Sequence, residues 1–311
     1  MMTLFKKSFT LSSPFFSFIA LALLIVSSAA SMARAQNLSA NSPAPSPGGS
    51  DGIALSPARF ELEMAPGSET TVVVNLDYHT ARADAQAYRL VASLNDWDMS
   101  QAGALSFYKA GTRPNSASPW MIYSPSEITA QPGQTNSIRV TISVPKTATP
   151  GDHLAALIVE QRPDTIKFNR NARAMLMRFR MAAIFYIKIP QITRHGTLEN
   201  LKATSDQGGI IVIPTLKNAG NSMIRPTTSL KIVDSQGRTV AELPDAETLP
   251  ILSGSELSQP LVIEKLLQPG AYTVSYRVDF QNGSKVVEGV TDLVVKESLA
   301  SKPVASLPPP K

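Results

Sequence analysis

The chain of 311 residues contains no cysteine, which excludes disulfide bonds and a lipid anchor on a cysteine. Only 6% of the residues are aromatic, and there are two tryptophans and three histidines. No apolar run reaches the roughly 20 residues that a membrane-spanning helix needs. We therefore expect a fold held together by its hydrophobic core alone, without a membrane span.

The N-terminus has the three parts of a secretory signal peptide. Lys6 and Lys7 precede an apolar run at residues 15–26, and the small-residue motif Ala33-Arg34-Ala35 follows it. We expect residues 1–35 to be removed by cleavage after Ala35. The sequence thus predicts an exported protein, periplasmic or extracellular.

The formal charge of +5 is mostly a property of this signal segment. Three of the 29 basic residues and none of the 24 acidic residues lie in it, so the mature chain carries a formal charge of +2. A balance so close to neutral gives no support for nucleic acid as a partner.

The remaining chain divides by composition into four parts. Residues 36–52 are rich in Ser, Pro, Ala and Gly and predict a flexible leader, and residues 297–311 predict a disordered Pro-rich tail. Between them, short apolar or alternating runs are separated by turn signals at roughly 8–12-residue spacing. This pattern predicts an all-β protein with two tandem immunoglobulin-like β-sandwich domains, at residues 53–190 and 191–296.

Two segments have clear strand and turn signals. Residues 55–64 read as one strand that ends at the turn Pro66-Gly67. Residues 272–280 and 285–295 read as a hairpin around Asn282-Gly283, which is the strongest short-range hairpin signal.

The most informative stretch is residues 175–190, which read as one long apolar strand. Alternate residues of a strand point to the same side, so one face carries the apolar residues Met175, Met177, Phe179, Met181, Ala183 and Phe185. Either a second sheet or another protein must cover this face.

Candidate chemistry is weak throughout the chain. The Gly-x-Ser-x-Gly match at residues 48–52 lies in the leader, where the strand and helix of a nucleophile elbow are not expected. His79, His153 and His195 are not spaced as metal ligands and are expected in solvated loops or at strand edges. Asp96 and Asp98 are expected as solvated turn carboxylates. We therefore expect no enzyme, no metal and no cofactor.

Trp97 and Trp120 leave two alternatives open. Both belong to the first predicted domain. They either pack in its core or form a platform for a sugar or an apolar partner.

The sequence resembles the periplasmic chaperones of pilus and fimbria assembly. The resemblance rests on Arg59 near the end of the first strand segment, and on Ile184-Phe185-Tyr186 followed by Pro190. It implies donor-strand addition, in which the chaperone's strand completes the sandwich of a secreted pilus or surface subunit. The implied subunit-binding residues are Met175, Met177, Phe179 and Met181.

The same resemblance implies that Arg59 anchors the subunit's C-terminal carboxylate. The family pairs this arginine with a lysine just before the Phe-Tyr sequence, where this chain has Ala183. Arg180 or Arg178 is the substitute that the sequence offers.

A second resemblance is to two-sandwich cell-surface proteins with a peptidoglycan-binding domain. It rests on Trp120, Pro132-Gly133-Gln134 and Pro150-Gly151, and later on residues 218–221 and 234–237. It implies cell-wall glycan or a surface protein as the partner. The sequence thus leaves open a chaperone, a surface-binding module and an envelope structural protein, and the exposure of residues 175–181 is the feature expected to discriminate between them.

Overall fold

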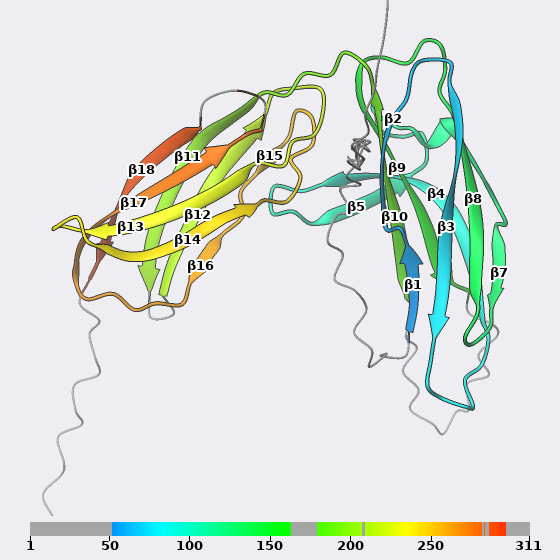
Figure 1. The fold of residues 1–311 in the computed structure, drawn as a ribbon, viewed down its shortest axis with the longest axis horizontal. Coiled ribbons are helices and arrows are strands. Elements are labelled where there is room, and N and C mark those ends of the chain that lie inside the picture. Colours follow the sequence, from blue (N-terminus) through cyan, green and yellow to red (C-terminus); the bar gives the residue numbers. More distant parts are fainter. Residues whose placement is uncertain (1–51, 163–178, 207–208, 282, 284–285, 297–311) are drawn as a thin grey trace, which may run out of the picture. The chain divides into compact units, whose positions relative to one another are not determined.

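The computed structural model describes residues 52–162, 179–206, 209–281, 283 and 286–296 (Figure 1). These residues form eighteen β-strands and one short 3₁₀ helix, Ser118–Trp120. Within these ranges there is no helix long and apolar enough to cross a membrane. The strands make four sheets arranged as two sandwiches, so the predicted all-β fold with two tandem sandwiches is confirmed.

The first sandwich consists of two sheets around one core. One sheet has the strand order β1 (Gly52–Ser56), β3 (Glu69–His79), β8 (Thr135–Ser143) and β6 (Met121–Ser124). The other has the order β2 (Arg59–Glu63), β10 (Arg180–Ile189), β9 (Gly151–Gln161), β4 (Tyr88–Met99) and β5 (Leu105–Lys109), with β7 (Glu127–Ala130) also paired to β4. Residues of both sheets, such as Val74, Ile138, Leu157 and Phe185, are buried between them.

The second sandwich repeats this plan with shorter edge strands. One sheet contains β11 (Gly196–Asp206) and β12 (Gly209–Asn218), with β15 (Glu256–Leu257) and β16 (Leu261–Ile263) paired to β12. The other has the order β14 (Thr239–Glu247), β13 (Thr227–Asp234), β17 (Gly270–Asp279) and β18 (Val287–Val295). Its core includes Val212, Ile232, Val274 and Tyr276.

The prediction of a single strand at residues 55–64 is wrong. Ser56 ends β1, which pairs with β3, and Arg59 begins β2, which pairs in parallel with β10 in the opposite sheet. Pro57 stands at the crossing, where it has no N–H to contribute to either ladder. The segment that is continuous in sequence is therefore divided between the two sheets of the sandwich.

The predicted hairpin of β17 and β18 is confirmed, and Asn282 of its predicted turn lies outside the described residues. The register pairs Val278 with Val287, which is symmetric about the predicted Asn282-Gly283 turn. Asp279 accepts a hydrogen bond from the Gln281 N–H at 2.8 Å, and Gln281 has a positive φ of 54°. Phe280, which directly follows β17, packs in the core of the second sandwich.

The described part of the apolar stretch at residues 175–190 begins at Phe179 and contains strand β10. Its odd-numbered residues, such as Phe185, face the core of the first sandwich, as the alternation predicts. Its even-numbered residues Ala182, Ile184 and Tyr186 belong to a separate apolar cluster on the outer face of the same sheet. Met175 and Met177 lie outside the described residues.

Asp96 is not the solvated turn carboxylate that the sequence predicts. It lies within β4, because this strand continues to Met99, and it is fully buried. Its carboxylate accepts hydrogen bonds from the N–H groups of Gly111 (3.2 Å), Thr112 (2.8 Å) and Arg113 (2.8 Å) and from the hydroxyls of Ser116 (2.5 Å) and Ser118 (2.7 Å). Burial alone would raise the pKa of Asp96, but these five donors outweigh it and hold the pKa below its ordinary value.

We expect Asp96→Ala to lower the free energy of unfolding by about 3 kcal/mol, because five donors that converge on a buried carboxylate lose their acceptor. Asp98→Ala is the matched control on the same strand. Asp98 forms a partly exposed ion pair with Arg113, and such a pair contributes about 1 kcal/mol or less. Urea unfolding followed by circular dichroism measures both variants, and equal losses would contradict the structural role of Asp96.

Candidate functional site

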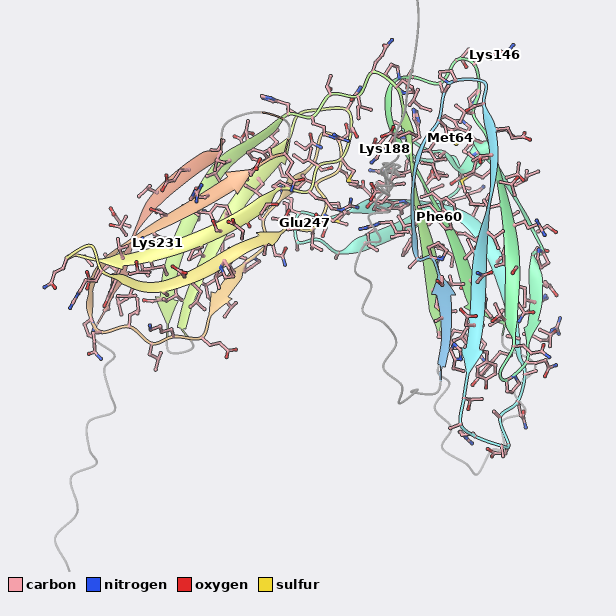
Figure 2. The ribbon with its side chains drawn as sticks, viewed as in Figure 1. Phe60, Met64, Lys146, Lys188, Lys231 and Glu247 are labelled. Atoms are coloured by element: carbon pink, nitrogen blue, oxygen red, sulfur yellow. The ribbon has the colours of Figure 1, made fainter. Side chains whose placement is uncertain are left out.

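The candidate site lies on the outer face of the sheet that contains β2, β10 and β9. The parallel register sets Arg59 beside Ile184, Glu61 beside Tyr186 and Glu63 beside Lys188. Because paired residues share a face, charged side chains of β2 and β10 lie together there, while Phe60 and Phe185 stack on the core side with ring centroids 4.7 Å apart. Figure 2 labels Phe60 and Lys188 on these neighbouring strands.

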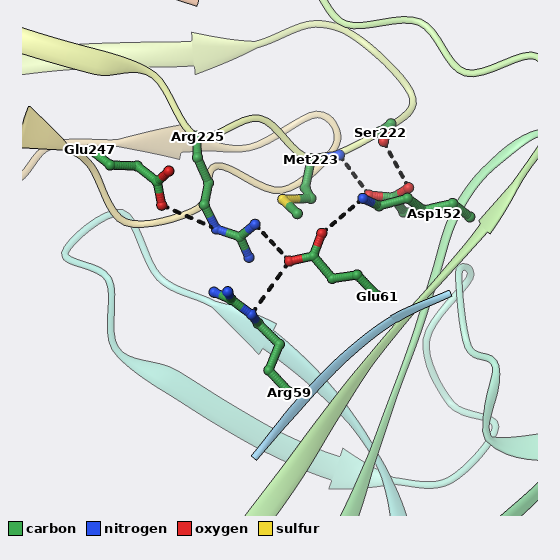
Figure 3. A network of polar contacts seen from close by, with 8 residues as sticks. Arg59, Glu61, Asp152, Ser222, Met223, Arg225 and Glu247 are labelled. Atoms are coloured by element: carbon green, nitrogen blue, oxygen red, sulfur yellow. Dashed lines mark hydrogen bonds and ion pairs between the residues drawn. The ribbon is translucent and has the colours of Figure 1, made fainter. Parts of the chain in front are cut away.

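Glu61 is the centre of an ionic network at this face (Figure 3). Its carboxylate accepts from Lys188 Nζ at 2.9 Å and from Arg225 Nη1 at 2.7 Å, and Arg59 Nε lies 3.4 Å away. Burial alone would raise the pKa of Glu61, but the hydrogen bond from Lys188 and the charge of Arg225 outweigh it, and the pKa is lowered. Glu61 is therefore ionised at neutral pH and surrounded by three cations.

Like Glu61, which contacts Arg225, Asp152 contacts the connection between β12 and β13, residues 219–226. Its carboxylate accepts from the Ser222 hydroxyl at 2.8 Å and from the Met223 N–H at 2.6 Å, and its own N–H donates to the Asn221 carbonyl at 2.9 Å. Burial raises the pKa of Asp152, against the lowering effects of the Met223 and Ser222 donors and of the Lys188 charge. Asp152 thus fixes this connection mainly through neutral donors.

Arg225 joins the two carboxylates Glu61 and Glu247. Its Nε lies 3.9 Å from a Glu247 oxygen, and its guanidinium carbon lies 5.7 Å from the centroid of the Tyr186 ring. The side chain is only 14% exposed. Its Nη2 atom is buried and has no hydrogen-bond partner among the described residues. Arg225 is therefore held from several sides but keeps an unused donor.

An apolar cluster surrounds these charges and covers the outer face of the sheet. Trp97 and Tyr186 meet edge to face with centroids 5.2 Å apart. Met223 and Leu252, from the second sandwich, pack into the same cluster. As a result, β9 is buried on both sides from Gly151 to Val159. Trp97 accordingly has a packing role, one of the two alternatives that the sequence left open.

Two of the predicted subunit-binding residues lie in the described chain. Phe179 and Met181 are partly buried and pack against the core of the first sandwich. The Phe179 ring meets Tyr88 edge to face at 5.4 Å. Their role in binding a subunit stays a prediction, as it does for Met175 and Met177.

The two predicted anchor arginines share the outer face but are not brought together. Arg59 is level with Ile184, four residues along β10 from Arg180, which corresponds to about 13 Å at the usual rise of a strand. Arg180 lies 4.0 Å from Glu160 and 5.4 Å from the centroid of Phe107. The cations that lie close to Arg59 are instead Lys188 and Arg225, through their shared contact with Glu61.

Strand β10 has an open edge next to Arg59. β2 pairs only with residues 184–188 of β10, where the Ile184 N–H donates to the Ala58 carbonyl at 2.9 Å. Because main-chain groups alternate between the two sides of a strand, those of Arg180 and Ala182 point to the side that β2 would occupy if it continued. In the described part of the chain, no strand pairs with them there.

The expected position of His153 is wrong. It lies inside β9, only 8% exposed, and its Nε2 is 2.9 Å from the Thr149 carbonyl oxygen. Trp120 packs against its ring, with centroids 4.4 Å apart. Among the described residues, no group of three His, Asp or Glu side chains lies close enough together to hold a metal ion.

Sequence reasoning missed most of the network. Two signals in the sequence could have indicated it. Lys188 is a cation inside the apolar run of residues 181–190, and Glu61 and Glu63 alternate with apolar residues in β2. A cation and carboxylates on buried strands indicate ion pairs. Nothing in the sequence indicates that their partner is Arg225, which is 164 residues from Glu61.

No protein-family model matches this chain, and no curated protein matches it. Among solved structures it is similar to a chaperone–tip adhesin complex of CFA/I fimbriae (TM-score 0.41, 10% identity, 78% of this chain and 99% of that chain). It is also similar to the class 5 fimbriae chaperone CfaA (TM-score 0.38, 12% identity, 78% and 100%). A third is the CsuC–CsuE chaperone–tip adhesion subunit complex of Acinetobacter baumannii (TM-score 0.38, 14% identity, 78% and 98%). At these TM-scores and identities, the function has to be argued from this chain's own residues.

We expect Glu61→Gln to reduce the dependence of the unfolding free energy on pH between pH 7 and pH 3. The pKa of Glu61 is below its ordinary value near 4.5 in the folded state, so its stabilising contribution is present above about pH 4.5 and is lost as the pH falls through the folded pKa. The variant starts about 1–2 kcal/mol less stable at pH 7 and loses less on acidification.

Glu63→Gln is the control for this experiment, because Glu63 lies on the same strand and face. The opposite contribution of Asp152, whose raised pKa favours the folded state on acidification, is common to all variants and cancels. Unfolding free energies between pH 7 and pH 3 measure the effect. An unchanged pH slope in Glu61→Gln would contradict the assignment.

Proposed function

We propose that this chain is an exported, chaperone-like protein of the periplasm or cell surface that binds a β-rich pilus or surface subunit by strand addition at β10. The observation that carries the proposal is the open edge of β10 at residues 180–183. An unpaired edge is a template for another strand, and proteins usually block such an edge unless they use it.

The backbone at this edge fits an added strand. Arg180 and Ala182 direct their N–H and C=O groups outward, and β9 on the other side holds β10 in register over its whole length. A partner strand would therefore meet an edge that β9 supports from the other side. In this recognition mode, main-chain hydrogen bonds supply affinity and alternate side chains supply specificity.

The side chains next to the edge support the same mode. Phe179 and Met181 face inward and are only partly buried, and Ala182 and Ile184 face outward and are also partly buried. A subunit sandwich added here would continue both layers, so these side chains would lie at the seam between two cores. Met175 and Met177 would extend the inward-facing row, and methionine suits an adaptable surface.

Arg59 lies where the open edge ends, at the first residue of β2. Its side chain is 46% exposed, and within the described residues its only ionic contact is the one from Nε to Glu61. A strand running along β10 toward β2 would thus bring its C-terminal carboxylate to this guanidinium. A charge-assisted hydrogen bond there would fix the partner's end and register.

We expect Ala182→Pro to abolish capture of the subunit, because proline removes the outward N–H and blocks strand addition while edge strands tolerate it. Ala182→Ser keeps the N–H and is the matched control. Tagged protein is purified from its own cell envelope, and the proteins that accompany it are identified by mass spectrometry. Equal unfolding temperatures of the two variants show that the fold is intact.

The proposal predicts that one small β-rich secreted subunit co-purifies in stoichiometric amounts with the wild type and with Ala182→Ser. The same subunit should be missing from the Ala182→Pro preparation. A subunit that accompanies all three variants would overturn strand addition at β10. Recovery without a subunit, together with binding to purified peptidoglycan in all three variants, would instead favour a surface module.

We expect Arg59→Ala to weaken binding of a strand-forming peptide with a free C-terminal carboxylate roughly tenfold, which is a typical contribution of a charge-assisted contact. The amidated form of the same peptide should bind both proteins equally. Fluorescence anisotropy measures the four affinities. Equal binding of the two peptides to the wild type would rule out the carboxylate anchor.

A further inference from the structure

The carboxylate of Glu61 already contacts Arg59, the residue that we propose binds a partner's terminal carboxylate. This carboxylate lies 3.4 Å from Arg59 Nε. The same carboxylate is held more closely by Lys188 (2.9 Å) and Arg225 (2.7 Å). Both of these cations are largely buried, with side chains 10% and 14% exposed. Arg59 is thus the loosest and most exposed of the three partners of Glu61.

Because Arg59 is the weakest of these contacts, moving it from Glu61 to an incoming carboxylate should cost little free energy. If Arg59 turns toward an incoming carboxylate, Glu61, whose side chain is 26% exposed, keeps two close cationic partners and is not left as a partly buried, unpaired charge. Leaving such a charge unpaired is the main cost of opening a buried ion pair.

We propose that Glu61 is an internal competitor that sets the affinity of Arg59 for a partner's terminal carboxylate, and that Arg225 of the second sandwich tunes it by holding Glu61. The proposal rests on the proposed strand-addition function and replaces Arg180 with Arg225 as the cation that works with Arg59. Glu61 and Arg225 are positioning residues in this scheme, since they act through Arg59.

The scheme predicts opposite effects of two substitutions in one network. Glu61→Gln frees Arg59 and removes a like charge, so the free-carboxylate peptide should bind about tenfold more tightly. Arg225→Gln takes one of the two close partners from Glu61, which then holds Arg59 more firmly, so that peptide should bind several-fold more weakly. The amidated peptide should bind all variants alike.

Two matched controls separate this scheme from a general charge effect. Glu63→Gln removes the same charge from the same strand and face, and Arg180→Gln removes a cation from that face. Both should change the affinity less than twofold. The probe is a short peptide that alternates threonine and valine, with its C-terminus free or amidated, and anisotropy gives its affinity for each variant.

The outcomes distinguish failure of the carboxylate anchor at Arg59 from failure of the competitor role of Glu61. If the wild type binds both peptides equally, the carboxylate anchor fails and the competitor scheme fails with it, whereas strand addition at β10 stands or falls with the Ala182→Pro experiment. If the wild type prefers the free carboxylate but Glu61→Gln binds no tighter than Glu63→Gln, or if Arg180→Gln weakens binding more than Arg225→Gln, the competitor scheme fails and the anchor stands.

A second measurement covers the case in which Glu61→Gln does not fold. In the wild-type protein, the NMR signal of the Arg59 Nε–H should shift on addition of the free-carboxylate peptide and stay in place with the amidated one. A shift with both peptides, or with neither, would overturn the exchange of Arg59 between the two carboxylates.

Discussion

The parallel pairing of β2 with β10 is the constraint on which the site depends. It places Phe60 on Phe185 inside the core and sets Arg59 and Glu61 beside Ile184 and Tyr186 outside it. β2 is a strand of five residues, reached by a crossing between sheets at Pro57. Because it is so short, it covers only one half of β10. One short strand therefore both assembles the cations around Glu61 and leaves the neighbouring edge open.

The apolar cluster and the ionic network have different physical roles at the outer face. Trp97, Tyr186 and Met223 remove large apolar surfaces from water, which contributes about 1.5–3 kcal/mol for each side chain. A buried ion pair offers little net stability, since desolvation offsets most of the attraction. In a chain without disulfides, the apolar contacts supply the energy that joins these elements, and Glu61, Arg225 and Asp152 determine which residues face one another.

The sequence predicts the strands well and their partners poorly. Alternation correctly placed Ala183 and Phe185 on the core face of β10, because that pattern is local. It could not divide residues 55–64 between two sheets, because pairing depends on contacts with β3 and β10 far along the chain. Asp96 and His153 were expected in solvent for the same reason. Their burial is decided by the connection at residues 111–118 and by Trp120, which supply partners that no local pattern reveals.

A comparison of Glu61 with Asp152 explains why Arg59 is the residue of the network that can exchange its contact. Both are partly or largely buried beside Lys188, yet the pKa of one is lowered and that of the other is raised. Asp152 is bonded to neutral donors of the β12–β13 connection, so moving it would break that connection. Glu61 is bonded to cations, one of which is half exposed at the end of an open strand edge. A negatively charged chain end can therefore replace a contact of Glu61 without disturbing Asp152, and the exchange is confined to the place where an added strand would end.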